Sequence, residues 1–229
     1  MRSKKTLWIL AALLAVGIAG AIPLLRPVEN TAYISGQLPH RTTDDLFQQS
    51  SLVALGQVTD ISDAFRIEST SGGTAIYTDY TFTISRLVRG TNTAESVTVR
   101  VPGGTVDHYT EVYEPCAKLE EDGEYLLFLQ RPYGGGAYNT AGDYYYVLGL
   151  AQGAFTAVDE EKTQFVSQLG VELDLGQMAM AYADEPVDEN YARREFIENQ
   201  QWNLESGFIT QEEYDQFMAE LDVYATILP

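Results

Sequence analysis

The chain has 229 residues, with 14 basic and 33 acidic side chains, a formal net charge of −19 and a single cysteine. This charge argues against a nucleic-acid partner, because proteins bind nucleic acids by neutralising phosphates with Lys and Arg. One cysteine excludes an intrachain disulfide, so the fold must rest on its hydrophobic core, for which 45% hydrophobic residues suffice.

Residues 1–26 predict one hydrophobic N-terminal helix that exports the rest of the chain. Basic residues precede an uncharged, apolar run at residues 7–25, which suits an uncleaved transmembrane anchor or a signal peptide. A signal peptide would be cleaved after Ala21, where Ala19 and Gly20 supply small residues. Basic residues before the span keep the N-terminus inside. We therefore expect a cell-membrane protein with an extracellular domain, or a secreted protein after cleavage.

Residues 27–50 are predicted to be a linker with one short helix. The helix begins at Thr42 or Thr43, because Asp44 and Asp45 then lie at its positive N-terminus.

Residues 51–158 are predicted to form a β domain, because apolar and β-branched residues recur there between Gly-rich turns. Gly56 is expected to be a bulge or bend in the first strand, and Gly103 and Gly104 follow the end of the third. The expected strands are residues 52–58, 76–85, 97–101, 125–129, 144–150 and 154–158. They favour a small OB-like β-barrel, since a closed barrel has no exposed edge strand; a β-sandwich is the alternative.

Residues 159–229 are predicted to be an acidic helical segment, with three basic and seventeen acidic residues. Apolar residues at helical spacing indicate helices before Pro186 and before Gly207, which is placed as a C-terminal cap. Thr210 and Glu213 form a capping box at the start of a last helix. The segment is therefore expected to end in a helical hairpin.

The β region resembles a family of exported bacterial domains of unassigned function. The similar pieces are Leu-Val-Ala-Leu-Gly-Gln-Val at 52–58, Ile-Tyr-Thr-Asp-Tyr-Thr-Phe-Thr-Ile at 76–84, Val-Arg-Val-Pro-Gly-Gly at 99–104 and Gly-Glu-Tyr-Leu-Leu-Phe-Leu at 123–129. Their order is similar to that of the OB-like barrel of netrin-type domains, which include metalloproteinase inhibitors. Those inhibitors insert an N-terminal cysteine into the protease. This chain has no cysteine there, so the resemblance implies a fold and not inhibition.

Residues 204–215 resemble the short C-terminal helical hairpins called SHOCT domains, which serve in interaction or oligomerisation. A stable capped turn would produce the same pattern without that role, so both interpretations stay open.

Histidine chemistry is restricted to His40 and His108. His108 follows a predicted strand, in a loop where a site could be built, but no nucleophile motif accompanies it. A thiol pair of His108 with Cys116 has only nearness in sequence to support it. Cys116 beside Ala117 is expected to be a small core residue rather than a reactive thiol. A hydrolase using His108 is therefore an alternative function, and no catalytic residue is assigned.

Metal binding has one candidate, the acidic run Glu120, Glu121, Asp122 and Glu124. A calcium-binding surface sensor is a further alternative function, but a solvated turn explains the same residues. One cysteine and two separated histidines do not suit zinc, and no phosphate or dinucleotide motif occurs. No metal and no cofactor is assigned.

Tyrosines around a Gly-rich hairpin give the candidate partner-contact surface, because tyrosine offers large contact area at low entropy cost. Its members are Tyr133, Tyr138, Tyr144 and Tyr145. The alternative is that the strand tyrosines fill the barrel. The predicted function is a cell-surface or secreted, non-enzymatic binding module. Its partner is a protein or a cell-wall glycan and not a nucleic acid, with membrane contact through the N-terminal segment if that is uncleaved.

Overall fold

The computed structural model describes residues 30–36, 38–68, 73–92, 94–132, 143–183, 186–188 and 191–225. The hydrophobic helix predicted for residues 1–26 lies outside these ranges. Among the helices that are described, none has both the length and the apolar character needed to cross a membrane.

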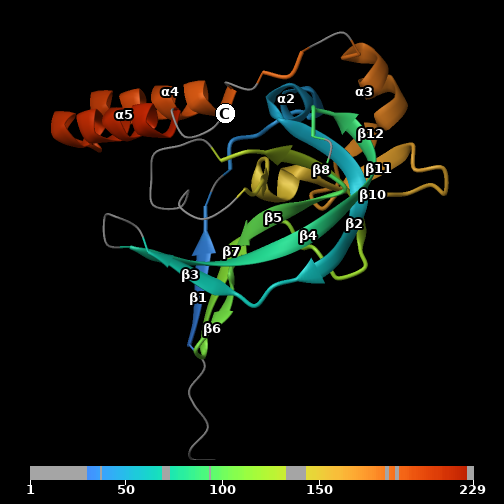
Figure 1. The fold of residues 1–229 in the computed structure, drawn as a ribbon, viewed down its shortest axis with the longest axis horizontal. Coiled ribbons are helices and arrows are strands. Elements are labelled where there is room, and N and C mark those ends of the chain that lie inside the picture. The colour runs from blue at the N-terminus through green and yellow to red at the C-terminus, as the bar shows by residue number, and fades with distance from the viewer. Residues whose placement is uncertain are drawn as a thin grey trace, which may run out of the picture.

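The described residues are mostly strands, with four helices (Figure 1). The strands are β1 (Asn30–Ser35), β2 (Leu52–Ile61), β3 (Phe65–Glu68), β4 (Thr74–Arg89), β5 (Ser96–Pro102), β6 (Gly104–Val106), β7 (Tyr109–Glu114), β8 (Glu124–Gln130), β9 (Tyr146–Val147), β10 (Ala154–Ala157), β11 (Gln164–Ser167) and β12 (Glu172–Asp174). The helices are α2 (Thr43–Gln49), α3 (Leu175–Ala181), α4 (Tyr191–Glu205) and α5 (Gln211–Ala225), and a 3-10 turn, η3, spans Leu150–Gly153.

The main sheet has nine strands in the order β12-β11-β10-β8-β2-β4-β3, with β5 also paired to β4 and β9 to β8. The predicted closed barrel is wrong. Between β5 and β9, the described residues contain a single isolated bridge, Val99 to Tyr145, in place of a ladder. The ladder stops because the predicted strand at residues 144–150 shortens to β9. Gly149 (φ +65°) and Leu150 (φ +54°) then turn the chain into η3.

The central strands β2 and β8 are buried on both faces and separate two cores. One core contains Leu52, Ala54 and Leu127; the other contains Val53 and Leu126 and is covered by α2 and α3. The strand predicted at residues 52–58 and the two-faced burial of residues 125–129 are therefore confirmed.

The predicted bulge at Gly56 is also confirmed. The pairing of β2 with β4 shifts register between Leu55 and Gly56. A Cβ atom on Gly56 would lie 2.2 Å from the carbonyl oxygen of Thr83, so only glycine fits this approach.

The segment predicted to be helical, residues 159–229, begins with strands instead of a helix. Residues 159–174 contain β11 and β12, which extend the main sheet beyond β10, and helical structure begins only at Leu175. Phe165 and Leu173 are buried in the core under these strands. The strands are four and three residues long, too short for alternation to be recognised in the sequence.

The predicted helical hairpin is present as α4 and α5, where Phe196 and Phe217 meet edge to face. Thr210 and Glu213 form the predicted capping box, and Gly207 has φ +74°. Arg41 donates a 2.6 Å hydrogen bond to Glu195, which connects α4 to the chain just before α2. The helix α2 begins as predicted, with Thr42 as its N-cap.

A second sheet of three strands, in the order β1-β7-β6, extends from one end of the main sheet (Figure 1). β1 pairs with β7 in parallel, from Asn30 opposite Tyr109 to Ser35 opposite Glu114. None of the three strands was predicted. This sheet provides one wall of the pocket described below.

Candidate functional site

Two of the four candidate contact tyrosines lie within the described residues. Tyr133 and Tyr138 lie outside them. Tyr144 and Tyr145 are only 6% and 5% exposed. The Tyr144 ring lies 3.9 Å from the guanidinium carbon of Arg100, and the Tyr145 hydroxyl accepts a hydrogen bond from Arg131. Their burial favours the alternative interpretation, in which the strand tyrosines fill the interior.

The structure separates His108 from Cys116. His108 is exposed in the two-residue turn between β6 and β7, and no described side chain hydrogen-bonds its imidazole. Cys116 lies beyond the other end of β7. Six residues of strand at about 3.3 Å each put roughly 20 Å between the two ends, so a thiol–imidazole pair cannot form in this fold.

The acidic run forms a solvated turn. Asp122 has φ +61° and its backbone N–H donates to the carbonyl oxygen of Val58. Glu124 pairs with the ammonium group of Lys162 at 2.7 Å. Within the part of the chain that the structure describes, no three His, Cys, Asp or Glu side chains are grouped to hold a metal ion.

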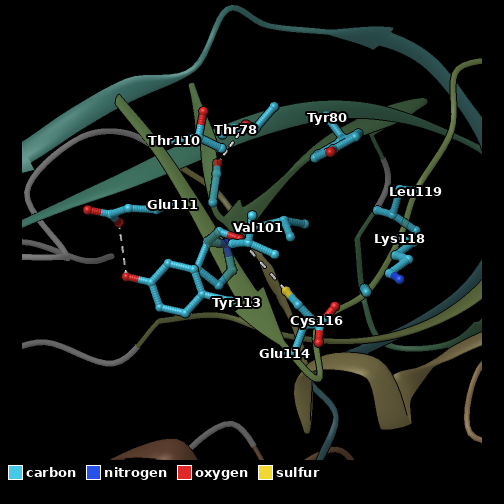
Figure 2. A pocket seen from close by; sticks show the side chains of 15 residues that line it. Thr78, Tyr80, Val101, Thr110, Glu111, Tyr113, Glu114, Cys116, Lys118 and Leu119 are labelled. Carbon is cyan, nitrogen blue, oxygen red and sulfur yellow. Dashed lines mark hydrogen bonds between the residues drawn. The ribbon is translucent and has the colours of Figure 1, made fainter. Parts of the chain in front are cut away.

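A pocket of about 440 Å³ lies between the main sheet and β7 (Figure 2). We call it the β4–β7 pocket. Its wall combines tyrosine rings, threonine hydroxyls, aliphatic side chains, two carboxylates and one lysine. The lining residues are Thr78, Tyr80, Val101, Pro102, Gly103, Gly104, residues 110–114 and residues 116–119.

Gly103 and Gly104 create the pocket by turning the chain out of the main sheet. Their φ angles are +114° and +134°, which side chains rarely adopt. A Cβ atom on Gly104 would lie 2.5 Å from the Cβ of Ala64 and 2.8 Å from the hydroxyl of Thr78. Only glycine lets β6 leave β5 here, and the predicted end of the strand at this pair is confirmed.

Glu111 fills the hydrogen-bonding gap that this departure leaves. The last residues paired between β4 and β5 are Tyr77 and Pro102. The next backbone N–H of β4, that of Ile76, donates instead to the Glu111 carboxylate, with 2.9 Å between N and Oε2. Tyr113 donates its hydroxyl to the same oxygen at 3.2 Å, and Figure 2 shows the two side chains side by side. Glu111 is 7% exposed.

The opposite side of the pocket carries the thiol of Cys116, which donates to the carbonyl oxygen of Pro102 at 3.8 Å. Burial raises the pKa of Cys116 to about 11, so the thiol is protonated and a poor nucleophile at neutral pH. The predicted core-like character of Cys116 fits this value, although its sulfur lines a pocket.

Two opposite charges stand near Cys116 at the pocket. Glu114 and Lys118 are both exposed lining residues. In the described ranges neither side chain has an ion-pair partner. They are available to a ligand without breaking an internal contact.

Neither Glu111 nor the pocket was predicted from the sequence. Glu111 lies in residues 109–114, which form β7. In this run Thr110, Val112 and Glu114 alternate with Tyr109, Glu111 and Tyr113. Both sets mix polar and apolar side chains, so the run lacks an apolar face and its pattern does not predict a strand.

Comparisons of the chain with protein-family models, with curated proteins and with solved structures found no match.

Proposed function

We propose that this chain is an exported, non-enzymatic binding module and that its ligand binds in the β4–β7 pocket. One observation carries the proposal: a pocket of about 440 Å³ in which tyrosine rings and aliphatic side chains surround a few fixed polar groups. That combination is typical of small-ligand sites. The partner is a protein segment or a cell-wall glycan, and the charge of −19 disfavours nucleic acid.

Export is the part of the proposal that the apolar residues 7–25 support. If these residues are retained, they anchor the module to the cell membrane. If the chain is cleaved after Ala21, the module is released. The resemblance to exported bacterial domains agrees with this location. The SHOCT-like hairpin α4–α5 is a second contact region in the proposal, and Tyr133 and Tyr138 remain candidates for a third.

The two alternative functions have less support. The exposed turn that holds His108 lies at the far end of β7 from the thiol, which argues against a hydrolase. Lys162 already neutralises Glu124 in the acidic turn, which argues against a calcium sensor.

Cys116 provides a direct test, because it is the single cysteine of the chain and lines the pocket. The purified full chain is incubated with soluble cell-wall glycan fragments or with a peptide library, and the rate of Cys116 alkylation is measured at pH 9. A partner in the pocket slows the alkylation. Binding by calorimetry with an unchanged alkylation rate places the site elsewhere. Turnover of a probe that is lost in His108→Ala supports the hydrolase instead.

A further inference from the structure

Glu111 is a buried carboxylate that lacks a positive partner among the described residues. Both of its hydrogen bonds come from neutral donors, the Ile76 N–H and the Tyr113 hydroxyl, and both end on Oε2. No described residue donates to Oε1. A buried charge is destabilising unless it is paired. Arg100, also buried, does have its counter-charge in Asp79. The Glu111 carboxylate therefore has no counter-charge among the described residues, and its Oε1 atom is left for a ligand.

The rest of the lining favours a cationic ligand over an anionic one. Glu114 adds a second carboxylate, and Lys118 is the only basic side chain among the lining residues. Tyr80 and Tyr113 offer ring faces, which attract cations. The chain as a whole carries −19, a field that concentrates cations and repels anions at its surface.

We infer that the β4–β7 pocket binds a primary alkylammonium group, with the Glu111 carboxylate as its counter-charge. The inference rests on the proposed function, and it names the ligand's chemistry. Two sources present this group: the side chain of a lysine in a peptide, and a free diamine. An ammonium group donates three hydrogen bonds, which suits the hydroxyl groups of the pocket wall and the Oε1 atom of Glu111, to which no described residue donates.

The experiment uses four probes on the purified full chain: 1,5-diaminopentane, Nα-acetyl-lysine amide, its Nε-acetylated form and 1-pentanol. Binding is followed by calorimetry and by protection of Cys116 from alkylation at pH 9. At this pH, amines with a pKa near 10.4 remain ammonium ions. We expect protection by one or both amines and none by the two neutral probes. Which amine binds more tightly identifies the source.

Two variants locate the charge. Glu111→Gln keeps the size of the side chain and an acceptor for Ile76 and removes the charge; we expect amine affinity to fall about tenfold or more. Lys118→Gln removes a positive charge that repels the positively charged amine, at an exposed residue without an ion-pair partner among the described residues. We expect the amines to bind about two- to fivefold more tightly to this variant. Because Lys118 is exposed, this second variant gives an answer even if Glu111→Gln does not fold, as checked by thermal unfolding.

The outcomes separate the two levels of the hypothesis. Equal protection by 1-pentanol, or unchanged amine affinity in a folded Glu111→Gln variant, overturns the ammonium inference and leaves the binding pocket standing. If Glu111→Gln does not fold, unchanged or weaker amine affinity in Lys118→Gln overturns it. If neither the amines nor any cell-wall fragment or peptide protects Cys116, the proposed function itself fails.

Discussion

The Arg100 guanidinium donates two hydrogen bonds to the carboxylate of Asp79, at 2.7 and 2.8 Å. The guanidinium carbon also lies 4.8 Å from the centre of the Phe65 ring and 3.9 Å from that of Tyr144. The pair crosses from β4 to β5 and connects them to the residue before the β5–β9 bridge. It therefore connects β4 and β5 to Tyr144 at the point where the ladder between β5 and β9 is incomplete.

Removing the carboxylate of Asp79 should destabilise the fold. We expect Asp79→Ala to lower the free energy of unfolding by about 3 kcal/mol, because it leaves the nearly buried Arg100 charge without its partner. Urea unfolding of the full chain measures the loss. Glu124→Ala, which breaks the exposed pair with Lys162, is the control and should cost about 1 kcal/mol or less. Equal losses in the two variants would show that the buried pair has no special role.

The glycine turn beside the pocket gives a second stability prediction. Gly104→Ala should cost about 2–5 kcal/mol, because it combines a φ of +134° with a Cβ atom only 2.5 Å from that of Ala64. Gly170→Ala is the matched control: its φ is +80°, but a Cβ atom there has nothing within 4 Å. It should cost about 1–2 kcal/mol, the strain alone. The difference between the two values reports the steric clash together with the greater backbone strain of φ +134°.

The β6–β7 turn makes a prediction of the opposite sign. Asp107 and His108 both have positive φ, +50° and +68°, as in a two-residue type I′ turn, which favours Asp-Gly. His108→Gly should therefore raise the free energy of unfolding by about 0.5–1 kcal/mol. Thermal unfolding checks this. If the variant is instead destabilised, the imidazole has a structural contact that this turn does not reveal.

The raised pKa of Cys116 predicts slow alkylation by iodoacetamide. With a pKa of about 11 against an ordinary 9.0, about one folded molecule in a thousand carries the thiolate at pH 8, against about one in ten for an unperturbed thiol. The folded chain should react about a hundredfold more slowly than the chain in guanidinium chloride. The rate should rise about tenfold per pH unit toward pH 11. A plateau near pH 8 would contradict the burial of the thiol.

The parts of this fold that the sequence predicts are those in which local and tertiary signals agree. Residues 52–55 and 125–129 are continuously apolar because β2 and β8 have a core on each face. The caps at Thr42 and Thr210 are local hydrogen-bond patterns, so they are visible without the fold.

The other features depend on contacts that are distant in the sequence. β11 and β12 are strands because β10 offers an edge to extend. Glu111 is buried because Gly103 and Gly104 leave Ile76 without a backbone acceptor. Tyr144 has its place because Arg100 lies against it. No property of residues 109–114 or 144–146 alone indicates these partners, and so the pocket could not be predicted.

The first strand determines which end of the described residues would lie nearest the bilayer if residues 7–25 remained in it. Asn30 hydrogen-bonds to His108 through its backbone N–H, and the chain from residue 25 to residue 30 reaches at most about 18 Å. The β6–β7 tip would then lie within about 18 Å of the end of that segment, and β1 would extend about 20 Å from the tip. Glu114 pairs with Ser35 at the other end of β1, so this edge of the pocket would be separated from the attachment point by the length of that strand.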